Sequence, residues 1–425
     1  MKAAGVQQPR SWGAFLGAAL LILLFILYFV PKVNVMQVPG FSVQVKPEDL
    51  YWLSLLPVLL VGPLRRLGLV GLAWVLLLVF LSISVFWHPN NLLFVGRLVF
   101  YSFPLILAVT LTTRQWDLAC RLTRIFLVGM AVVSALQTYT PFPYVHTGEF
   151  HLGPAGRAPG IYGNGVEFAL MALFAYWLLV MRGDRSTLPW LAALAITMFS
   201  GTRLATIMVL LSGLAMLRHW PWARLLTGAA LAASIALPAW WLKPEPSEES
   251  RLAEVDPMAV SSAFIQLLTS VEPATSTVQD TEGYCFDFDN SLAEDQSLAM
   301  RLSKLLFVVE NVVLGQYPLG FGLGRCIGDA GDNLYVRVLS DAGLPLFVLL
   351  LCFFVALLLS RPDDPGLRRD WRLFVAVLVG VSAFYDTIYF SRVAPLLFVI
   401  VIAADQRSGG TLLGDRRRGT AASPP

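Results

Sequence analysis

Four arginines stand next to apolar segments of the sequence, where their charges would lie at the rim of a bundle of apolar helices. They are Arg157, Arg203, Arg301 and Arg392. A guanidinium group binds phosphate oxygens through two parallel hydrogen bonds, and a cation beside an apolar helix is costly unless it meets an anion. The alternative for each one is a solvated arginine or one that pairs with a lipid headgroup. As a group, they predict a site for a lipid-linked pyrophosphate.

Asp332 is the candidate for proton transfer, because an ionised carboxylate within hydrogen-bond reach can take a proton from a sugar hydroxyl. It stands at the start of an apolar segment, with Asp341 about two and a half helical turns later. A structural role is also open, since aspartate is a frequent N-cap of helices, and the two roles can coexist. Arg97 is expected instead to pair with an internal acid or to extend its charge toward the headgroups.

The composition indicates that membrane helices hold these residues. The chain of 425 residues is 56% hydrophobic and 14% charged, whereas soluble domains have about 45–50% and about 25%. Apolar runs of about 15 to 25 residues recur along the sequence, and as helices they can cross a hydrocarbon core of about 30 Å. No cleavage site follows the first run, residues 13–30, so we expect it to be retained. The expected fold class is all-α, a polytopic transmembrane helical bundle.

The segments between these runs alternate between arginine-rich and arginine-poor, as the positive-inside rule requires. Six basic clusters after the N-terminus predict about twelve spans with both chain ends in the cytoplasm. The predicted spans are residues 13–30, 50–64, 67–87, 92–112, 125–140, 165–181, 188–200, 204–217, 225–242, 334–359, 373–389 and 393–404. The chain thus divides into nine spans in 1–242, a large outside loop in 243–333, three spans in 334–404 and a basic cytoplasmic tail in 405–425.

The large outside loop has three features of its own. Apolar residues at helical spacing within residues 291–310 predict an amphipathic helix that lies over the membrane part. Cys285 and Cys326 would pair in an oxidising exterior, or remain unpaired. The glycines of residues 320–324 favour a turn over a nucleotide-binding loop, because no strand precedes them. The histidines match no usual metal spacing, and the scattered arginines give no nucleic-acid footprint.

Four motifs resemble those of the bacterial O-antigen polymerase and ligase superfamily, and they are closer to the polymerases than to the ligases. They are Arg157-Ala-Pro-Gly-Ile-Tyr-Gly-Asn-Gly, Ser200-Gly-Thr-Arg203, Met300-Arg301, and Pro318-Leu-Gly-Phe-Gly-Leu-Gly324 with the following Gly331-Asp-Asn-Leu-Tyr and Ala342-Gly-Leu. With the span count and the large loop, the resemblance covers about residues 150–350, and the first 140 residues match only in topology. The ligases carry a histidine where this chain has Asp332.

The resemblance implies a membrane glycosyltransferase of the C type. Its donor would be an undecaprenyl-pyrophosphate-linked saccharide, with no nucleotide sugar, no metal and no other cofactor required, and its site would face the periplasm from a bacterial inner membrane. Arg157 and Arg301 would hold the departing pyrophosphate, and Asp332 would be the base. Residues within or next to the motifs are expected to bind substrate: Arg203, Asn333, Tyr335, Tyr162, Asn164 and Arg325.

The expected function is an O-antigen polymerase that transfers a growing glycan from undecaprenyl pyrophosphate to the non-reducing end of a lipid-linked repeat unit. One alternative is a ligase or another glycan transferase that uses the same donor. Another is a transporter of lipid-linked saccharides, which would show broken helices and charges near the bilayer midplane. The expected partners are the lipid-linked oligosaccharides, membrane lipids and a chain-length regulator protein, and no nucleic acid.

Overall fold

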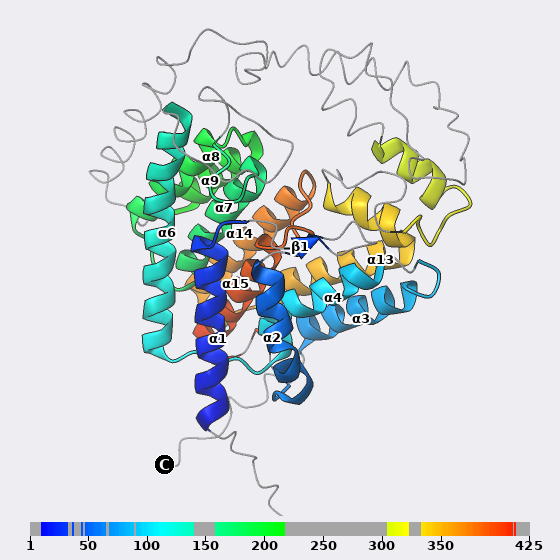
Figure 1. The fold of residues 1–425 in the computed structure, drawn as a ribbon, viewed down its shortest axis with the longest axis horizontal. Coiled ribbons are helices and arrows are strands. Elements are labelled where there is room, and N and C mark those ends of the chain that lie inside the picture. Colours follow the sequence, from blue (N-terminus) through cyan, green and yellow to red (C-terminus); the bar gives the residue numbers. More distant parts are fainter. Residues whose placement is uncertain are drawn as a thin grey trace, which may run out of the picture.

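Figure 1 shows the fold of the protein in a computed structural model. The model describes residues 10–32, 36–37, 44–45, 47–64, 68–88, 91–139, 158–216, 304–322, 333–410 and 412–413. Their fold is all-α, apart from one antiparallel pair of two-residue strands, β1 (Met36–Gln37) and β2 (Gln44–Val45). The predicted ninth span, most of the large loop and the Cys285–Cys326 pair lie outside the described residues.

The helices follow the predicted apolar runs. They are α1 (Arg10–Phe29), α2 (Pro47–Val61), α3 (Leu69–Ser84), α4 (Asn91–Tyr101), α5 (Phe103–Ile106), α6 (Thr113–Tyr139), α7 (Gly165–Met181), α8 (Thr187–Phe199), α9 (Arg203–Met216), α13 (Leu334–Leu359), α14 (Pro365–Ser382) and α15 (Val393–Arg407). Two predicted spans, 165–181 and 334–359, agree with α7 and α13 to the residue. Both helices follow an asparagine whose side chain accepts hydrogen bonds from the first turn, so a local cap sets where each begins.

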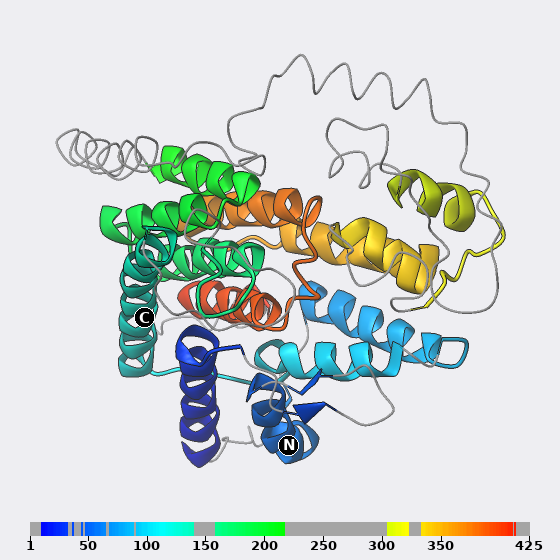
Figure 2. The ribbon, with the colours of Figure 1, turned by 45° about the horizontal axis from the view of Figure 1, so that its top comes forward.

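The centre of the fold is α7. Its side chains from Glu167 to Met181 are all buried, as expected for a helix that is apolar on every side. Helices α8 and α15 pack along it, α6 packs on α8, and α1 packs on α6. A second group, in which α13 packs on α3 and α3 on α4, runs across the direction of α1 and α6 (Figure 1, Figure 2). The described helices therefore run in more than one direction, and the twelve-span bundle stays a prediction.

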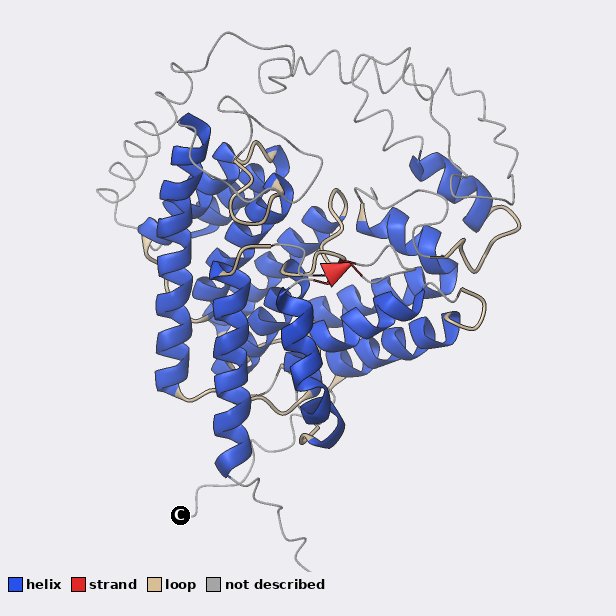
Figure 3. Cartoon of the chain, viewed as in Figure 1, coloured by secondary structure: helices blue, strands red, loops and turns tan. Residues whose placement is uncertain are grey.

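Apolar side chains cover much of the outside of the fold. On α13, Leu344, Val348, Leu351, Val355 and Leu358 are exposed, and their alternating spacing of four and three residues places them in one stripe. An exposed apolar surface of this kind marks a site of contact with lipid or protein. Within the described part of the chain, the helices that are long and apolar enough to cross a membrane are Trp12–Phe29, Thr113–Tyr139 and Leu334–Leu359. These features agree with a helical membrane protein (Figure 3).

The predicted span at residues 92–112 is wrong as a single helix. Helix α4 ends at Tyr101, α5 is one short turn, and residues 108–112 are not helical. The cause is Pro104, which lacks a backbone N–H and can therefore begin a helix but not continue one. The chain crosses this part of the fold in two pieces.

The predicted span at residues 373–389 is displaced along the chain. Helix α14 begins at Pro365, after the N-cap Asp364, and it stops at Ser382. Residues 383–392 form turns that lead into α15. This connection is partly buried, and its apolar side chains resemble a helical run in the sequence.

The predicted topology can be tested with single cysteines in a cysteine-free chain. The side chain of Arg185, next to Ser186, reaches the segment that carries Gly366, because a Cβ on Gly366 would lie 3.9 Å from Arg185 Nη2. Both positions are predicted to be cytoplasmic, and Gly148 and Ser276 are predicted to be outside. A membrane-impermeant thiol reagent should therefore label the latter two in intact cells and the former two only after permeabilisation. Labelling at Gly366 in intact cells would contradict the twelve-span topology.

Candidate functional site

Some of the predicted site residues lie outside the described residues: Arg157, Arg301, Arg325 and Asp332. Their roles stay predictions. The others lie at the starts of three helices. Tyr162, Asn164 and Arg203 lie beside the start of α7 or of α9, and Asn333 and Tyr335 lie at the start of α13.

The segment before α7 is held by two of these residues. Tyr162 is fully buried and donates a hydrogen bond to the carbonyl of Leu27 at 2.9 Å. Asn164 Oδ1 accepts from the backbone N–H groups of Val166 and Glu167 at 2.9 and 3.3 Å, which makes it the N-cap of α7. These contacts are structural, and saccharide binding by either side chain stays a prediction.

The Ser200-Gly-Thr-Arg203 motif forms a tight turn between α8 and α9. It adjoins the segment before α7, because the N–H of Ala158 donates to the carbonyl of Phe199 at 2.9 Å. Arg203 is the first residue of α9 and is partly exposed. It forms no ion pair with another described residue, and the dipole of α9 disfavours a cation at this end. An anionic ligand would offset that cost.

The start of α13 is capped by Asn333. Its side-chain oxygen accepts from the N–H groups of Tyr335 and Val336 at 2.9 and 3.3 Å. The structural alternative for Asp332, that it caps this helix, is therefore wrong, because the next residue does so. Tyr335 donates its hydroxyl hydrogen to the carbonyl of Val379 at 3.0 Å and so fixes α13 to α14.

Helix α13 is broken at Gly343, which has φ 78° and ψ −173°. The glycine-rich turn within the large loop fills the break: Phe321 N–H donates to the carbonyl of Ser340 at 2.7 Å, and Leu344 N–H donates to that of Pro318 at 2.9 Å. Of the glycines predicted to form a turn, Gly320 packs against the broken helix at Ser340, Ala342 and Gly343. The first part of α13 becomes a short separate helix.

The predicted amphipathic helix of the large loop is described only from Lys304. It is α-helical to Val308 and ends in a π-helical turn, Val309–Val313. This segment buries Phe307, Val308 and Val312. They pack with Phe321 and with Val336 and Leu339 of α13 in a small separate core. Leu305 and Leu306 of this helix are exposed. This helix covers the start of α13.

The sequence predicted that Arg392 lies at the rim of the helix bundle, and this prediction is wrong. It is fully buried, and its Nη2 lies 3.2 Å from Oε2 of the equally buried Glu48. Ser391 donates to the other oxygen of Glu48 at 2.9 Å, and Arg392 Nη1 donates to the carbonyl of Val30 at 2.6 Å. Its guanidinium carbon is 4.8 Å from the centre of the Tyr162 ring. The anion that this arginine needs is thus an internal one.

Two further cations near this pair are also satisfied within the fold. Arg97 Nη2 lies 3.7 Å from Asp49 Oδ2, so the ion pair, one of the two roles predicted for Arg97, is present. Lys32, after the end of α1, pairs with the fully buried Glu167 of α7. Opposite charges are therefore matched where α1, α2, α4 and α7 come together.

A second buried cluster lies on the first part of α13. Arg337 Nη1 donates to Asp386 Oδ2 at 2.9 Å, and its Nε lies 3.5 Å from Asp341 Oδ2. Tyr389 donates to the same oxygen of Asp341 at 2.9 Å, and its ring centre is 4.1 Å from the guanidinium carbon. Buried charges persist only when they are paired and hydrogen-bonded. This network fixes the α14–α15 connection against α13.

The connection at residues 383–392 is therefore the structural hub of the candidate site. It holds α13 through Asp386 and Tyr389, and it holds α1 and α2 through Arg392. Sequence reasoning missed Arg337 and Asp386. A signal was present, because Arg337 and Asp341 stand four residues apart inside an apolar run, which favours a buried ion pair on one helix face.

Another set of ion pairs lies toward the opposite end of α14. Arg185 Nη2 is 2.7 Å from the buried Asp370 Oδ2, and Arg124 Nε is 2.7 Å from Asp184 Oδ2. Burial alone raises the pKa of Asp184, but hydrogen bonds from Ser186 and Arg124 outweigh it, and the pKa lies below its ordinary value. These pairs join the α7–α8 turn to α6 and α14.

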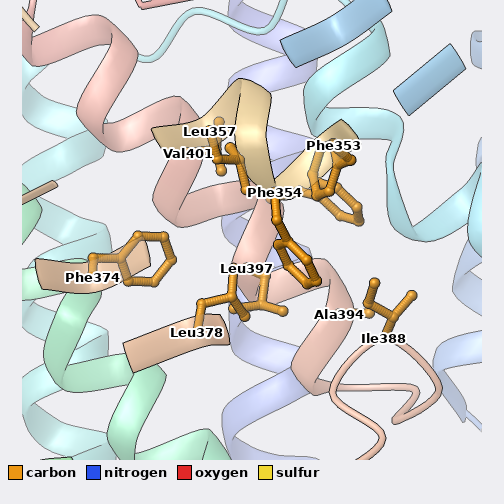
Figure 4. Close-up of a pocket in the computed structure, with 10 residues that line it drawn as sticks. Phe353, Phe354, Leu357, Phe374, Leu378, Ile388, Ala394, Leu397 and Val401 are labelled. Atoms are coloured by element: carbon orange, nitrogen blue, oxygen red, sulfur yellow. The ribbon is translucent and has the colours of Figure 1, made fainter. Parts of the chain in front are cut away.

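A small cavity lies between α13, α14 and α15 (Figure 4). Its volume is about 20 Å³, and its lining is apolar, with Phe354, Phe374 and Ile388 among the residues around it. That volume is close to the minimum for one water molecule. The cavity is too small for a saccharide or a pyrophosphate, so it is not the candidate site.

The chain matches no known protein-family model, and no curated protein is significantly similar to it in sequence. Among the described residues, no three His, Cys, Asp or Glu side chains come together in a way that could hold a metal ion. The described polar contacts join helices to one another. The predicted anion-binding and base residues border them in the chain, since Arg157 precedes Ala158 and Asp332 precedes Asn333.

Proposed function

We propose that this chain is a polyprenyl-pyrophosphate-dependent glycosyltransferase, and specifically an O-antigen polymerase. It transfers a growing glycan from undecaprenyl pyrophosphate to the non-reducing end of a lipid-linked repeat unit. The proposed setting is a bacterial inner membrane crossed by about twelve helices, with the site on the periplasmic side. The apolar outer faces of α6 and α13 support a membrane setting.

One observation carries the proposal: parts of the polymerase-like motifs that are separated in the sequence contact one another. Thr202 of the Ser200–Arg203 motif donates a hydrogen bond to the carbonyl of Gly165, which ends the first motif, at 3.3 Å. Ala158 of the first motif is hydrogen-bonded to Phe199, which directly precedes the Ser200–Arg203 motif. Pro318, which begins the fourth motif, is hydrogen-bonded to Leu344, which ends it. Contacts between the motif segments support a common site better than their presence in the same chain does.

In the proposed reaction, the hydroxyl oxygen of the acceptor sugar attacks the anomeric carbon of the donor sugar. The new glycosidic C–O bond forms while the bond between that carbon and the pyrophosphate oxygen breaks. Asp332 takes the hydroxyl proton. Arg157 and Arg301 hold the departing polyprenyl pyrophosphate and stabilise the negative charge that it gains. Arg203, at the start of α9, is a third cation for the same group.

Arg157→Lys and Arg301→Lys should each lower polymer formation by about 10²- to 10³-fold, with normal amounts of protein in the membrane. A lysine keeps the positive charge but loses the two parallel hydrogen bonds to phosphate. Asp332→Asn should have an effect of similar size because it removes the base, and the helix keeps its cap at Asn333. The measurement is the polymer per unit of membrane protein in source cells that lack their own copy of the gene. Arg124→Lys is the matched control and should retain polymer formation.

The product that remains in these inactive variants separates the candidate functions. A failed polymerase leaves single repeat units on the final acceptor, whereas a failed ligase leaves the acceptor bare and long glycan on polyprenyl pyrophosphate. The break in α13 beside Arg337 and Asp341 favours a transporter as the second candidate. A failed transporter leaves the acceptor bare and only short lipid-linked saccharide in the membrane. Either of the last two patterns would contradict the polymerase.

A further inference from the structure

Two parts of the proposed site are tied to the same connection, residues 383–392. Arg392 packs on the ring of Tyr162, which follows Arg157 by five positions in the sequence. Asp386 pairs with Arg337. Arg337 in turn follows Asp332 by five positions. One short segment thus holds both the region after the proposed pyrophosphate ligand and the helix after the proposed base.

We propose that the Arg337–Asp386 pair is a positioning element of the transferase, which sets the spacing between the segment before α7 and the start of α13. The inference rests on the proposed function. Neither side chain of the pair contacts substrate. The pair acts through the backbone of residues 383–392, which it holds against α13 at one end while Arg392 holds Glu48 and Tyr162 at the other.

The contacts of the Arg337–Asp386 pair suit it to fix the distance between α13 and the connection at residues 383–392. The side chains of Arg337 and Asp386 are only 11% and 7% exposed, so they lie largely out of reach of water. Asp341 and Tyr389 hold the guanidinium group from two other sides. A sideways shift of Arg337 would therefore break several contacts at once. Spacing matters in group transfer, because a misplacement of reacting groups by about 1 Å can cost roughly 10²-fold in rate.

Two conservative variants change the length of the pair while keeping its charges. Asp386→Glu adds one methylene group, and Arg337→Lys shortens the cation. We expect each to lower kcat by about 10- to 100-fold, with a KM for the lipid-linked saccharide within about threefold of the unmodified value. The Arg337→Lys/Asp386→Glu double variant should recover much of the lost kcat, because the longer glutamate compensates for the shorter lysine. The substrate is polyprenyl-pyrophosphate-linked repeat units extracted from source cells that lack the gene, and the purified protein is assayed in lipid vesicles.

Asp370→Glu is the matched control. Asp370 is also a buried aspartate paired with an arginine, Arg185, at 2.7 Å. It lies on α14 sixteen positions before Asp386, near the opposite end of that helix. This variant should lower the thermal stability about as much as Asp386→Glu does, and it should leave kcat unchanged.

Folded Asp386→Glu and Arg337→Lys proteins with the unmodified kcat would overturn the proposal. A fall in kcat of equal size in Asp370→Glu would overturn it too, because the effect would then follow from stability alone. Loss of folded protein in both variants would likewise assign the pair to stability and not to spacing. The proposed function fails by a different result, which is that the unmodified protein forms no polymer in the same assay.

Discussion

Replacement of Arg392 by methionine is expected to lower the free energy of unfolding by about 3–5 kcal/mol. Glu48 would then keep its negative charge inside the fold, where both side chains are fully buried. A buried carboxylate that loses its cation cannot recover the lost interaction from water. The carbonyl of Val30 would also lose its hydrogen bond from Arg392. The measurement is chemical unfolding of the purified protein in detergent, followed by tryptophan fluorescence.

Two further variants identify the cause of this loss. Glu48→Gln/Arg392→Met removes both charges, so it should be more stable than Arg392→Met alone. Arg124→Met breaks a pair whose arginine is 49% exposed, and such a pair contributes at most about 1 kcal/mol. If Arg392→Met proved no more harmful than Arg124→Met, the buried pair would not be a main source of stability. If the double variant were the least stable of the three, an unpaired charge would not be the cause.

Local sequence signals were sufficient for the helices that begin at a side-chain cap. Asn164 and Asn333 each precede a long apolar run, and the helices that follow, α7 and α13, have the predicted bounds. A cap and an apolar run act within a few residues of each other. The choice between neighbouring caps was less secure, because Asp332 and Asn333 are adjacent and only the latter caps α13.

The breaks between helices were not predicted, because apolar residues continue through them. Residues 383–390 contain aromatic and aliphatic side chains, and Asp386 is their one charged residue. Hydropathy alone therefore extends a span over a segment that forms turns. The turns are stable because Asp386 finds Arg337 on α13, a contact that the local sequence does not contain.

The partners of the buried charges were beyond sequence reasoning for the same reason. A buried arginine requires an anion, but nothing local indicates that Arg392 would meet Glu48, 344 positions away. The rim placement predicted for Arg392 assumed that its anion would be a ligand. By contrast, the pair of Arg337 with Asp341 needed only helical spacing, and closer attention to that spacing would have found part of the candidate site.

Gly343→Ala is expected to lower the free energy of unfolding by on the order of 3 kcal/mol. At φ 78° and ψ −173°, the backbone of Gly343 lies in a region that residues with a side chain rarely adopt. A Cβ there would also overlap the carbonyl oxygen of Pro318 and the backbone of Leu319. Because both obstacles are backbone atoms, the turn that fills the break in α13 would have to move away.

The matched control is Gly129→Ala, in α6. A Cβ on Gly129 meets nothing within 4 Å, and alanine is the better helix former by roughly 0.5–1 kcal/mol, so this variant should be neutral or slightly stabilising. Thermal unfolding in detergent compares the two variants at equal protein concentration. Equal stability of Gly343→Ala and Gly129→Ala would mean that α13 can continue through position 343 without the break. In that case the contact between the glycine-rich turn and α13 would not require glycine, and the convergence of motifs that supports the proposed transferase would lose one of its two pairs.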